Sequence, residues 1–176
     1  SCAKLLLKLG VKKENLFMFD SVGLLTEARR PELNKYKALF IQKNNQTLTE
    51  ALQGADVFVG VSKGNLISGE MIAKMAQQPI IFALANPIPE ISYDEAKKYV
   101  PDAIVATGRS DFPNQVNNVL GFPFIFRGAL DVQAKAINQE MKLAAVRALA
   151  ALTKEKVPEE VIKAYGKNFS LGPDYI

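Results

Sequence analysis

The sequence predicts an α/β protein with a Rossmann-like, doubly wound parallel sheet that lacks its first strand and its glycine-rich turn, and with helices in its C-terminal part. Two observations lead to this fold class. Short apolar segments rich in β-branched residues alternate with segments that carry helix start signals, which is the order expected of a parallel sheet. The chain also opens directly on a helix-like segment, which in such folds follows a strand and a glycine turn.

The alternating segments define the individual elements. We expect strands over residues 16–20, 56–62, 79–85 and 103–107. We expect helices over residues 2–9, 32–41, 47–53, 68–75 and 92–99. Ser68 and Ser92 stand just before acidic residues of a first helical turn, which favours an N-cap role for both.

The last third of the chain is predicted to be helical. The apolar run after Gly121 indicates a buried helix that extends to about Ile137. Further helices are expected over 138–152 and 158–165, followed by an extended tail over 168–176. Residues 1–176 are therefore interpreted as one domain, with a Rossmann-like core over about 1–110 and a helical C-terminal part over 111–176.

Composition excludes several classes of function. The net charge of +4 is spread along the chain, whereas a nucleic-acid site is normally a clustered basic stripe, and no apolar run is long enough to span a membrane. The absence of His excludes Ser-His-Asp triads and HExxH zinc sites. The single cysteine, Cys2, excludes a structural zinc cluster and fits a reducing compartment, so we expect a cytoplasmic protein.

Small or polar residues stand where the predicted strands end, at the edge where parallel sheets bind ligands. Asp20 is placed to bind the ribose of a dinucleotide, although a simple turn is the alternative. Gly60, Val61 and Ser62 would let a cofactor approach the backbone closely, or would merely form a tight turn. Asn86 stands before a proline, so its amide is expected to project from the sheet edge unless it only forms a turn.

The loop after the last strand is rich in amides. Asn117 and Asn118 precede an apolar segment whose helix N-terminus would favour an anionic ligand such as a carboxylate, with helix capping as the alternative. Arg109 and Asp111 are spaced for a local ion pair. Arg127 is interpreted as a member of a buried structural pair, or else as an anion contact.

Several long motifs carry a resemblance to a known family. Asp20-Ser-Val-Gly23, Phe82-Ala-Leu-Ala-Asn-Pro87 and the segment 106–131 (ATGRSDFPNQVNNVLGFPFIFRGALD) resemble the malic enzymes of the small, prokaryotic type. The segments 138–149 and 169–176 extend the resemblance, which covers essentially the whole chain in order. The resembling region is the C-terminal NAD(P)-binding domain of those enzymes.

The resemblance implies the oxidative decarboxylation of malate to pyruvate and carbon dioxide, with reduction of NAD or NADP. It implies that Asn86 and Asn118 hold the substrate beside the nicotinamide. The cofactor-binding residues that it implies are Asp20, Ser21, Gly60, Val61, Ser62, Asn86 and Asn117. A homodimer and a divalent metal, Mg²⁺ or Mn²⁺, are implied as well, the metal polarising the C2 oxygen of the substrate.

The family's acid–base tyrosine and lysine, its metal ligands and its glycine-rich turn fall in a region that would precede Ser1. We therefore predict no catalytic residue and no metal ligand in this segment, and no malate turnover by it alone. Cofactor choice stays open, because Asp20 favours NAD while Ser21 with Arg29 or Arg30 could accept a 2′-phosphate.

Two other functions stay open at this point. One is a related two-domain amino-acid dehydrogenase, against which the Asn-Gln-Val-Asn-Asn run over 114–118 argues. The other is a catalytically inactive module that binds nucleotide or mediates dimerisation.

Overall fold

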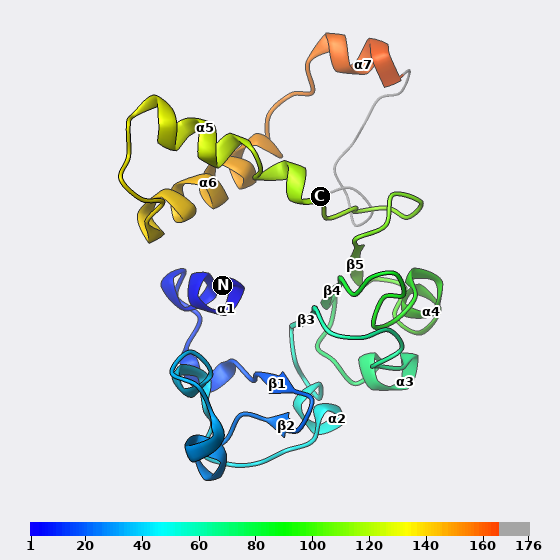
Figure 1. Cartoon of the computed structure of the whole chain (residues 1–176). Helices are drawn as coiled ribbons and strands as arrows, with labels where there is room; N and C mark the ends of the chain where they lie inside the picture. The colour runs from blue at the N-terminus through cyan, green and yellow to red at the C-terminus, as the bar shows by residue number, and fades with distance from the viewer. Residues whose placement is uncertain (166–176) are drawn as a thin grey trace.

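A three-stranded parallel sheet organises one lobe of the molecule, together with α3 and α4 (Figure 1). In the computed structural model, which describes residues 1–165, this sheet has the order β3-β4-β5. Its strands are β3 (Val57–Gly60), β4 (Ile80–Ala83) and β5 (Ile104–Thr107). Each lies inside a predicted strand, because short β-branched runs suit a buried pleated sheet. The predicted Rossmann-like α/β fold is confirmed.

Helices α3 (Gly69–Ile72) and α4 (Tyr93–Tyr99) cover one face of this sheet (Figure 1). The core between them contains Phe58, Ile81 and Val105 from the three strands and Ile72 and Ala96 from the helices. Both helices begin at the predicted caps, since the hydroxyl of Ser68 accepts the amide of Met71 and that of Ser92 accepts the amide of Glu95. The N-cap predictions are confirmed, although α3 ends before the expected residue 75.

Residues 16–20 do not join the parallel sheet, contrary to our expectation. They end in β1 (Phe19–Asp20), which pairs antiparallel with β2 (Gly23–Leu24) in a separate hairpin. The Asp20 carboxylate accepts the backbone amides of Val22 at 3.0 Å and Gly23 at 3.3 Å. Because of this turn, β1 pairs with the residues that directly follow it in the chain. The strand prediction was therefore correct only for Phe19 and Asp20, and the expected pairing within the parallel sheet was wrong.

The remaining N-terminal elements are short. They are α1 (Cys2–Lys8), η1 (Lys13–Asn15), η2 (Glu27–Glu32), η3 (Lys37–Phe40) and α2 (Leu48–Ala51). The expected short helix over 32–41 forms only in part, as the 3₁₀ helix η3: before it, the Asn34 side chain accepts the amides of Tyr36 and Lys37 and forms a local turn. A second core of Leu25, Phe40 and Ile41 packs against α1 through Ala3 and Leu7, whereas Leu48 of α2 packs against the core of the parallel sheet.

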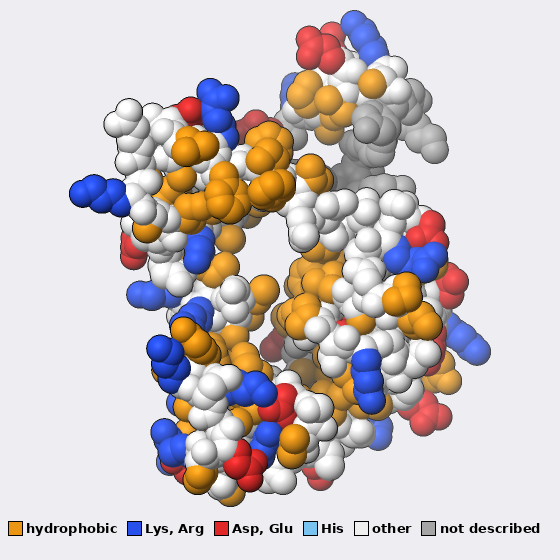
Figure 2. Space-filling model, in the orientation of Figure 1, with side chains coloured by type: hydrophobic (Ala, Val, Ile, Leu, Met, Phe, Trp, Pro, Cys, Tyr) orange, Lys and Arg blue, Asp and Glu red, His pale blue; other side chains and the backbone are white. Residues whose placement is uncertain are grey.

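The C-terminal part is helical, with η4 (Asn118–Leu120), α5 (Phe124–Asp131), α6 (Gln139–Leu152) and α7 (Glu159–Tyr165). The expectation of a buried helix after Gly121 is wrong. Phe124 and Leu130 of α5 are 65% and 74% exposed, and Figure 2 shows hydrophobic side chains gathered on the surface over this region. The periodicity correctly indicated an apolar face on α5. Among the described residues α6 packs on α5, but this contact leaves Phe124 and Leu130 exposed. The expected tail over 168–176 lies outside the described residues.

Of the helices within residues 1–165, none combines the length and the apolar character needed to cross a bilayer.

Candidate functional site

The three parallel strands end side by side. Gly60, Ala83 and Thr107 are register partners across the sheet, so the chain leaves β3, β4 and β5 at the same level. This confirms the predicted sheet edge for three of the four expected strands. Open parallel sheets bind their ligands at this carboxyl edge.

The exit of β3 combines a buried glycine with two exposed residues. Gly60 is buried, while Val61 is 75% exposed and Ser62 is exposed as well. The backbone amide of Ser62 donates to the carboxylate of Glu90 at 2.8 Å, which fixes the path of this exit. Of the three residues predicted to line a cofactor here, Val61 and Ser62 are therefore accessible at the edge and Gly60 is not.

The exit of β4 places Asn86 next to the exit of β5. The side chain of Asn86 lies against Gly108, because a Cβ built on Gly108 would be 3.4 Å from Nδ2 and 3.5 Å from Oδ1 of Asn86. Asn86 itself is exposed, as its projection from the sheet edge requires. Its amide can donate and accept hydrogen bonds without carrying charge.

The loop after β5 folds back onto its own strand. The amide of Val116 donates to the carbonyl of Thr107 at 2.8 Å, and the buried side chain of Asn114 donates to the carbonyl of Val105 at 3.1 Å. Arg109 and Asp111 form the expected local ion pair, with an N–O distance of 2.6 Å. These contacts give the first half of the loop a structural role.

Asn117 and Asn118 stand at the start of η4. The side-chain oxygen of Asn117 accepts the amide of Val119 at 3.1 Å, so the capping alternative is realised for Asn117. Asn118 is the first residue of η4 and is exposed. Further on, Arg127 pairs with Asp131 at 2.7 Å on the surface of α5; the pair is structural, but it is exposed and not buried.

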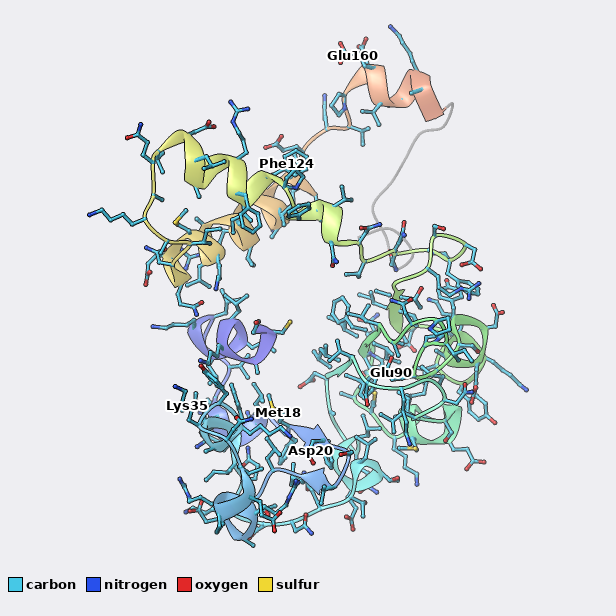
Figure 3. All side chains as sticks on the ribbon, viewed as in Figure 1. Met18, Asp20, Lys35, Glu90, Phe124 and Glu160 are labelled. Atoms are coloured by element: carbon cyan, nitrogen blue, oxygen red, sulfur yellow. The ribbon has the colours of Figure 1, made fainter. Side chains whose placement is uncertain are left out.

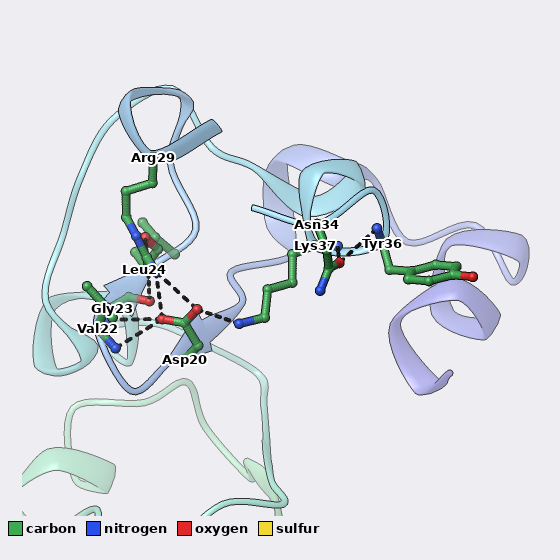
Figure 4. A network of polar contacts seen from close by, with 8 residues as sticks. All are labelled: Asp20, Val22, Gly23, Leu24, Arg29, Asn34, Tyr36 and Lys37. Carbon is green, nitrogen blue, oxygen red and sulfur yellow. Dashed lines mark hydrogen bonds and ion pairs between the residues drawn. The ribbon is translucent and has the colours of Figure 1, made fainter. Parts of the chain in front are cut away.

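Asp20 is the centre of a separate polar cluster (Figure 4). Arg29 donates to both of its carboxylate oxygens, at 2.9 and 3.0 Å, and Lys37 donates to Oδ2 at 2.7 Å. The hydrogen bond from Lys37, with the amide of Val22 and the guanidinium of Arg29, lowers the pKa of Asp20 far below its usual value although burial opposes this. The cluster therefore holds one negative and two positive charges.

Other basic groups lie around this cluster. Arg30 is engaged by Glu27 at 2.6 Å, on the surface. Lys37 also lines a cavity of about 430 Å³ between α1, η3 and α6, together with Lys4 and Lys142. None of the residues that line this cavity belongs to β3, β4 or β5, so it is distinct from the strand-end site.

The structure thus brings together part of the predicted site. Gly60 and Ser62 lie against one buried carboxylate that also accepts the amide of Ala85, the residue before Asn86, while Asp20 and Ser21 belong to the separate hairpin. Sequence reasoning missed Glu90, although an acid between Pro89 and Ile91 in an apolar run was a signal of burial. It also missed Lys37, which contacts Asp20 across 17 residues without any local signal.

Within the described part of the chain, no group of three or more Cys, Asp and Glu side chains is arranged to hold a metal ion. The strand ends, in contrast, carry residues that suit a nucleotide. Val61, Ser62 and Asn86 are exposed at the strand ends, whereas Gly60 is buried against Glu90, so it is the exposed residues that fit a nucleotide approaching this edge.

Comparison with known proteins identifies relatives along the whole chain. A family model described as the NAD-binding domain of malic enzyme matches residues 7–164. The chain is 54% identical to the NADP-dependent malic enzyme of Halomonas elongata and 48% identical to the NAD-dependent malic enzyme of Rhizobium meliloti. It aligns over its full length with both, and spans only 42% and 23% of their respective lengths.

A solved structure agrees with these matches. The crystal structure of the malic enzyme of Entamoeba histolytica superimposes with a TM-score of 0.82 at 37% identity. The superposition covers 99% of this chain and 35% of the other.

Proposed function

Because this chain belongs to the malic enzyme family, in which it matches the NAD-binding domain, we propose that it is the cofactor-binding part of an enzyme that oxidatively decarboxylates malate to pyruvate and carbon dioxide. NAD or NADP is reduced in that reaction. The observation that carries the proposal in the structure is the common edge at which exposed Ser62 and Asn86 follow β3 and β4, whose exits are joined by hydrogen bonds from Ser62 and Ala85 to Glu90.

The proposed roles follow the three exits. Val61 and Ser62 contact the cofactor at the exposed exit of β3, with Asn117 proposed on the cofactor side as well, while Gly60 is buried against Glu90 and supports this exit. Asn86 and Asn118 orient the substrate beside the nicotinamide, because uncharged amides can bind a hydroxyl and a carboxylate at once. When bound, the nicotinamide supplies the hydride acceptor.

The polar cluster supports a choice between the two nucleotides. Asp20 and Ser21 are proposed to face the adenine ribose. Both oxygens of Asp20 are already engaged by Arg29 and Lys37, so Asp20 is less available to a ribose hydroxyl than a free carboxylate would be. The surplus positive charge, on a Lys37 side chain that is 41% exposed, favours the 2′-phosphate of NADP.

Five further parts of the hypothesis stay predictions. We propose that the divalent metal is bound by residues outside this segment, that the enzyme is a homodimer, and that it works in the cytoplasm. We also propose that this segment alone does not turn over malate, and that its Rossmann-like core ends at about residue 110.

The test is malate-dependent reduction of NADP⁺ and NAD⁺ by the full-length protein with Mn²⁺. Asn86→Ala and Asn118→Ala are each expected to lower kcat/KM for malate by about 100-fold, as loss of a substrate-orienting group does. Asn45→Ala, which changes an exposed amide in the loop before α2, serves as the matched control. Turnover of amino acids in place of malate, or site variants that behave like Asn45→Ala, would contradict the proposal.

A further inference from the structure

Glu90 is a fully buried acid in the segment that joins β4 to α4. Its exposed fraction is 0%, and it lies within the lobe built by the sheet, α3 and α4 (Figure 3). Buried carboxylates are rare unless their oxygens are satisfied by hydrogen bonds or by a positive charge. The contacts of Glu90 therefore identify what it holds in place.

The two carboxylate oxygens of Glu90 hold two different strand exits. Oε1 accepts the amide of Ser62, after β3, at 2.8 Å, and Oε2 accepts the amide of Ala85, after β4, at 3.0 Å. Ala85 is the residue directly before Asn86. One side chain thus connects the exit that carries Ser62 to the exit that carries Asn86.

The backbone around Glu90 strengthens the same connection. The amide of Ile67 donates to the carbonyl of Glu90 at 3.2 Å, and the amide of Asn65 donates to the carbonyl of Pro89 at 3.0 Å. The segment after β4 is therefore fastened to the segment after β3 by main-chain and side-chain contacts together.

The Glu90 carboxylate lies directly against the backbone of Gly60. A Cβ built on Gly60 would lie 2.5 Å from Oε1 and 2.7 Å from Cγ of Glu90, which is closer than real atoms approach. Gly60 has an ordinary backbone conformation, without a positive φ. The position therefore needs glycine because the carboxylate lies against it.

We propose that Glu90 is a positioning residue, whose carboxylate sets the spacing and orientation of Ser62 on the cofactor side relative to Asn86 on the substrate side. The inference rests on the proposed function for the identity of the two ligands. Glu90 is buried beneath the exits and touches neither ligand. Its effect on the reaction passes through the two amides that it holds.

The first test compares Glu90→Gln with Glu95→Gln in the full-length protein. Glutamine keeps the shape of Glu90 but replaces one acceptor oxygen by an NH₂ donor, so one of the two amides loses its partner. Glu95 is the matched control, because its carboxylate also accepts a backbone amide, that of Gly69 at 2.9 Å, but joins α3 to α4 instead of two strand exits.

We expect Glu90→Gln to raise KM for both NADP⁺ and malate by about fivefold and to lower kcat by about tenfold, with NADPH still bound at one molecule per chain. Glu95→Gln is expected to leave these constants within about twofold. A merely structural role of Glu90 would lower thermal stability and the amount of active protein without changing either KM. That result would overturn the proposal.

The second test uses Gly60. Gly60→Ala alone is expected to impair the enzyme as Glu90→Gln does, because the new Cβ displaces the carboxylate. In a Glu90→Ala background the same Gly60→Ala change is expected to add no further loss, since the carboxylate that it would meet is gone. Equal additional losses in both backgrounds would overturn the proposal. Gly128→Ala is the control, at a glycine with open space around it.

Nucleotide binding separates failure of this inference from failure of the proposed function. If the wild-type protein does not oxidise malate, the proposed function is wrong. The dissociation constant of NADPH, measured by fluorescence, then still tests Glu90. An increase of about fivefold in Glu90→Gln over Glu95→Gln supports the positioning role, and equal values for the two variants overturn it.

Discussion

The charge on Asp20 is held by donors from three different places in the chain. Lys37, the amide of Val22 and Arg29 all donate to it, and together they lower its pKa. A carboxyl whose pKa is lower in the folded state stabilises the fold above its unfolded pKa, at about pH 4. That contribution is lost as the pH falls through the folded pKa.

Asp20→Asn is therefore expected to lower the free energy of unfolding at neutral pH by about 1–2 kcal/mol, because it leaves Arg29 and Lys37 without their partner. The difference from wild type should shrink progressively below about pH 4, where the carboxyl of the unfolded chain becomes protonated while that of the folded chain still keeps its charge. Urea unfolding of the full-length protein at several pH values measures this. Glu27→Gln, which breaks only an exposed pair, is the control; a difference that does not change with pH would contradict the explanation.

Lys37 is expected to discriminate between the nucleotides. Lys37→Gln removes the partly exposed cation of the cluster, so KM for NADP⁺ should rise by about tenfold while KM for NAD⁺ changes by less than about twofold. Lys35→Gln is the matched control, because Lys35 is an exposed lysine two residues away, over the ring of Tyr36. Steady-state kinetics with both nucleotides decides the matter, and an equal effect on the two would exclude a 2′-phosphate contact.

At the scale of single elements, α4 depends on its N-cap. The hydroxyl of Ser92 accepts the amide of Glu95 at 3.1 Å, and α4 packs on α3 and β5. Ser92→Ala should cost about 1 kcal/mol of stability, since it leaves a first-turn amide without its partner. Thermal unfolding measures the loss, with exposed Ser110→Ala as the control. Equal melting temperatures for the two variants would show that the cap contributes nothing.

The elements that sequence predicted well carry their signals locally. The caps at Ser68 and Ser92 and the β-branched strands at 57–60, 80–83 and 104–107 are such cases. The strand predicted at 16–20 and the helix predicted at 32–41 form only in part, because Asp20 and Asn34 turn the backbone through side-chain hydrogen bonds. The burial of α5 was predicted wrongly, because periodicity reveals that a helix has an apolar face but not whether another element covers that face.

The candidate site shows the same difference between features with a local sequence signal and features without one. Gly60, Ser62 and Asn86 could be predicted because strand ends mark the edge of a parallel sheet. The contact of Glu90 with Ser62 spans 28 residues and that of Lys37 with Asp20 spans 17, and no local pattern encodes such distances. Local sequence signals therefore predict where the strand exits lie, whereas the buried and long-range contacts of these exits carry no such signal, and the site roles stay predictions.

At the scale of the whole molecule, two separate places carry polar groups suited to one long ligand. The strand-end edge presents Ser62 and Asn86, and the hairpin cluster presents Asp20 with its two cations. A dinucleotide has two chemically different ends, a nicotinamide and an adenosine, and the proposed function assigns one to each place. Variants at the two places are therefore expected to affect nucleotide binding through different parts of the cofactor.

Removal of the metal tests whether nucleotide binding and metal binding use different parts of the enzyme. The nucleotide contacts proposed at the strand ends and at the Asp20 cluster lie on this chain, and no metal-binding group of acids or cysteines is found within residues 1–165. Chelation by EDTA should therefore abolish malate oxidation by the full-length protein while the dissociation constant of NADPH stays within about twofold, and Mn²⁺ should restore turnover. If NADPH binding disappears together with activity, the metal and the nucleotide share ligands, and the proposed separation of the two sites is wrong.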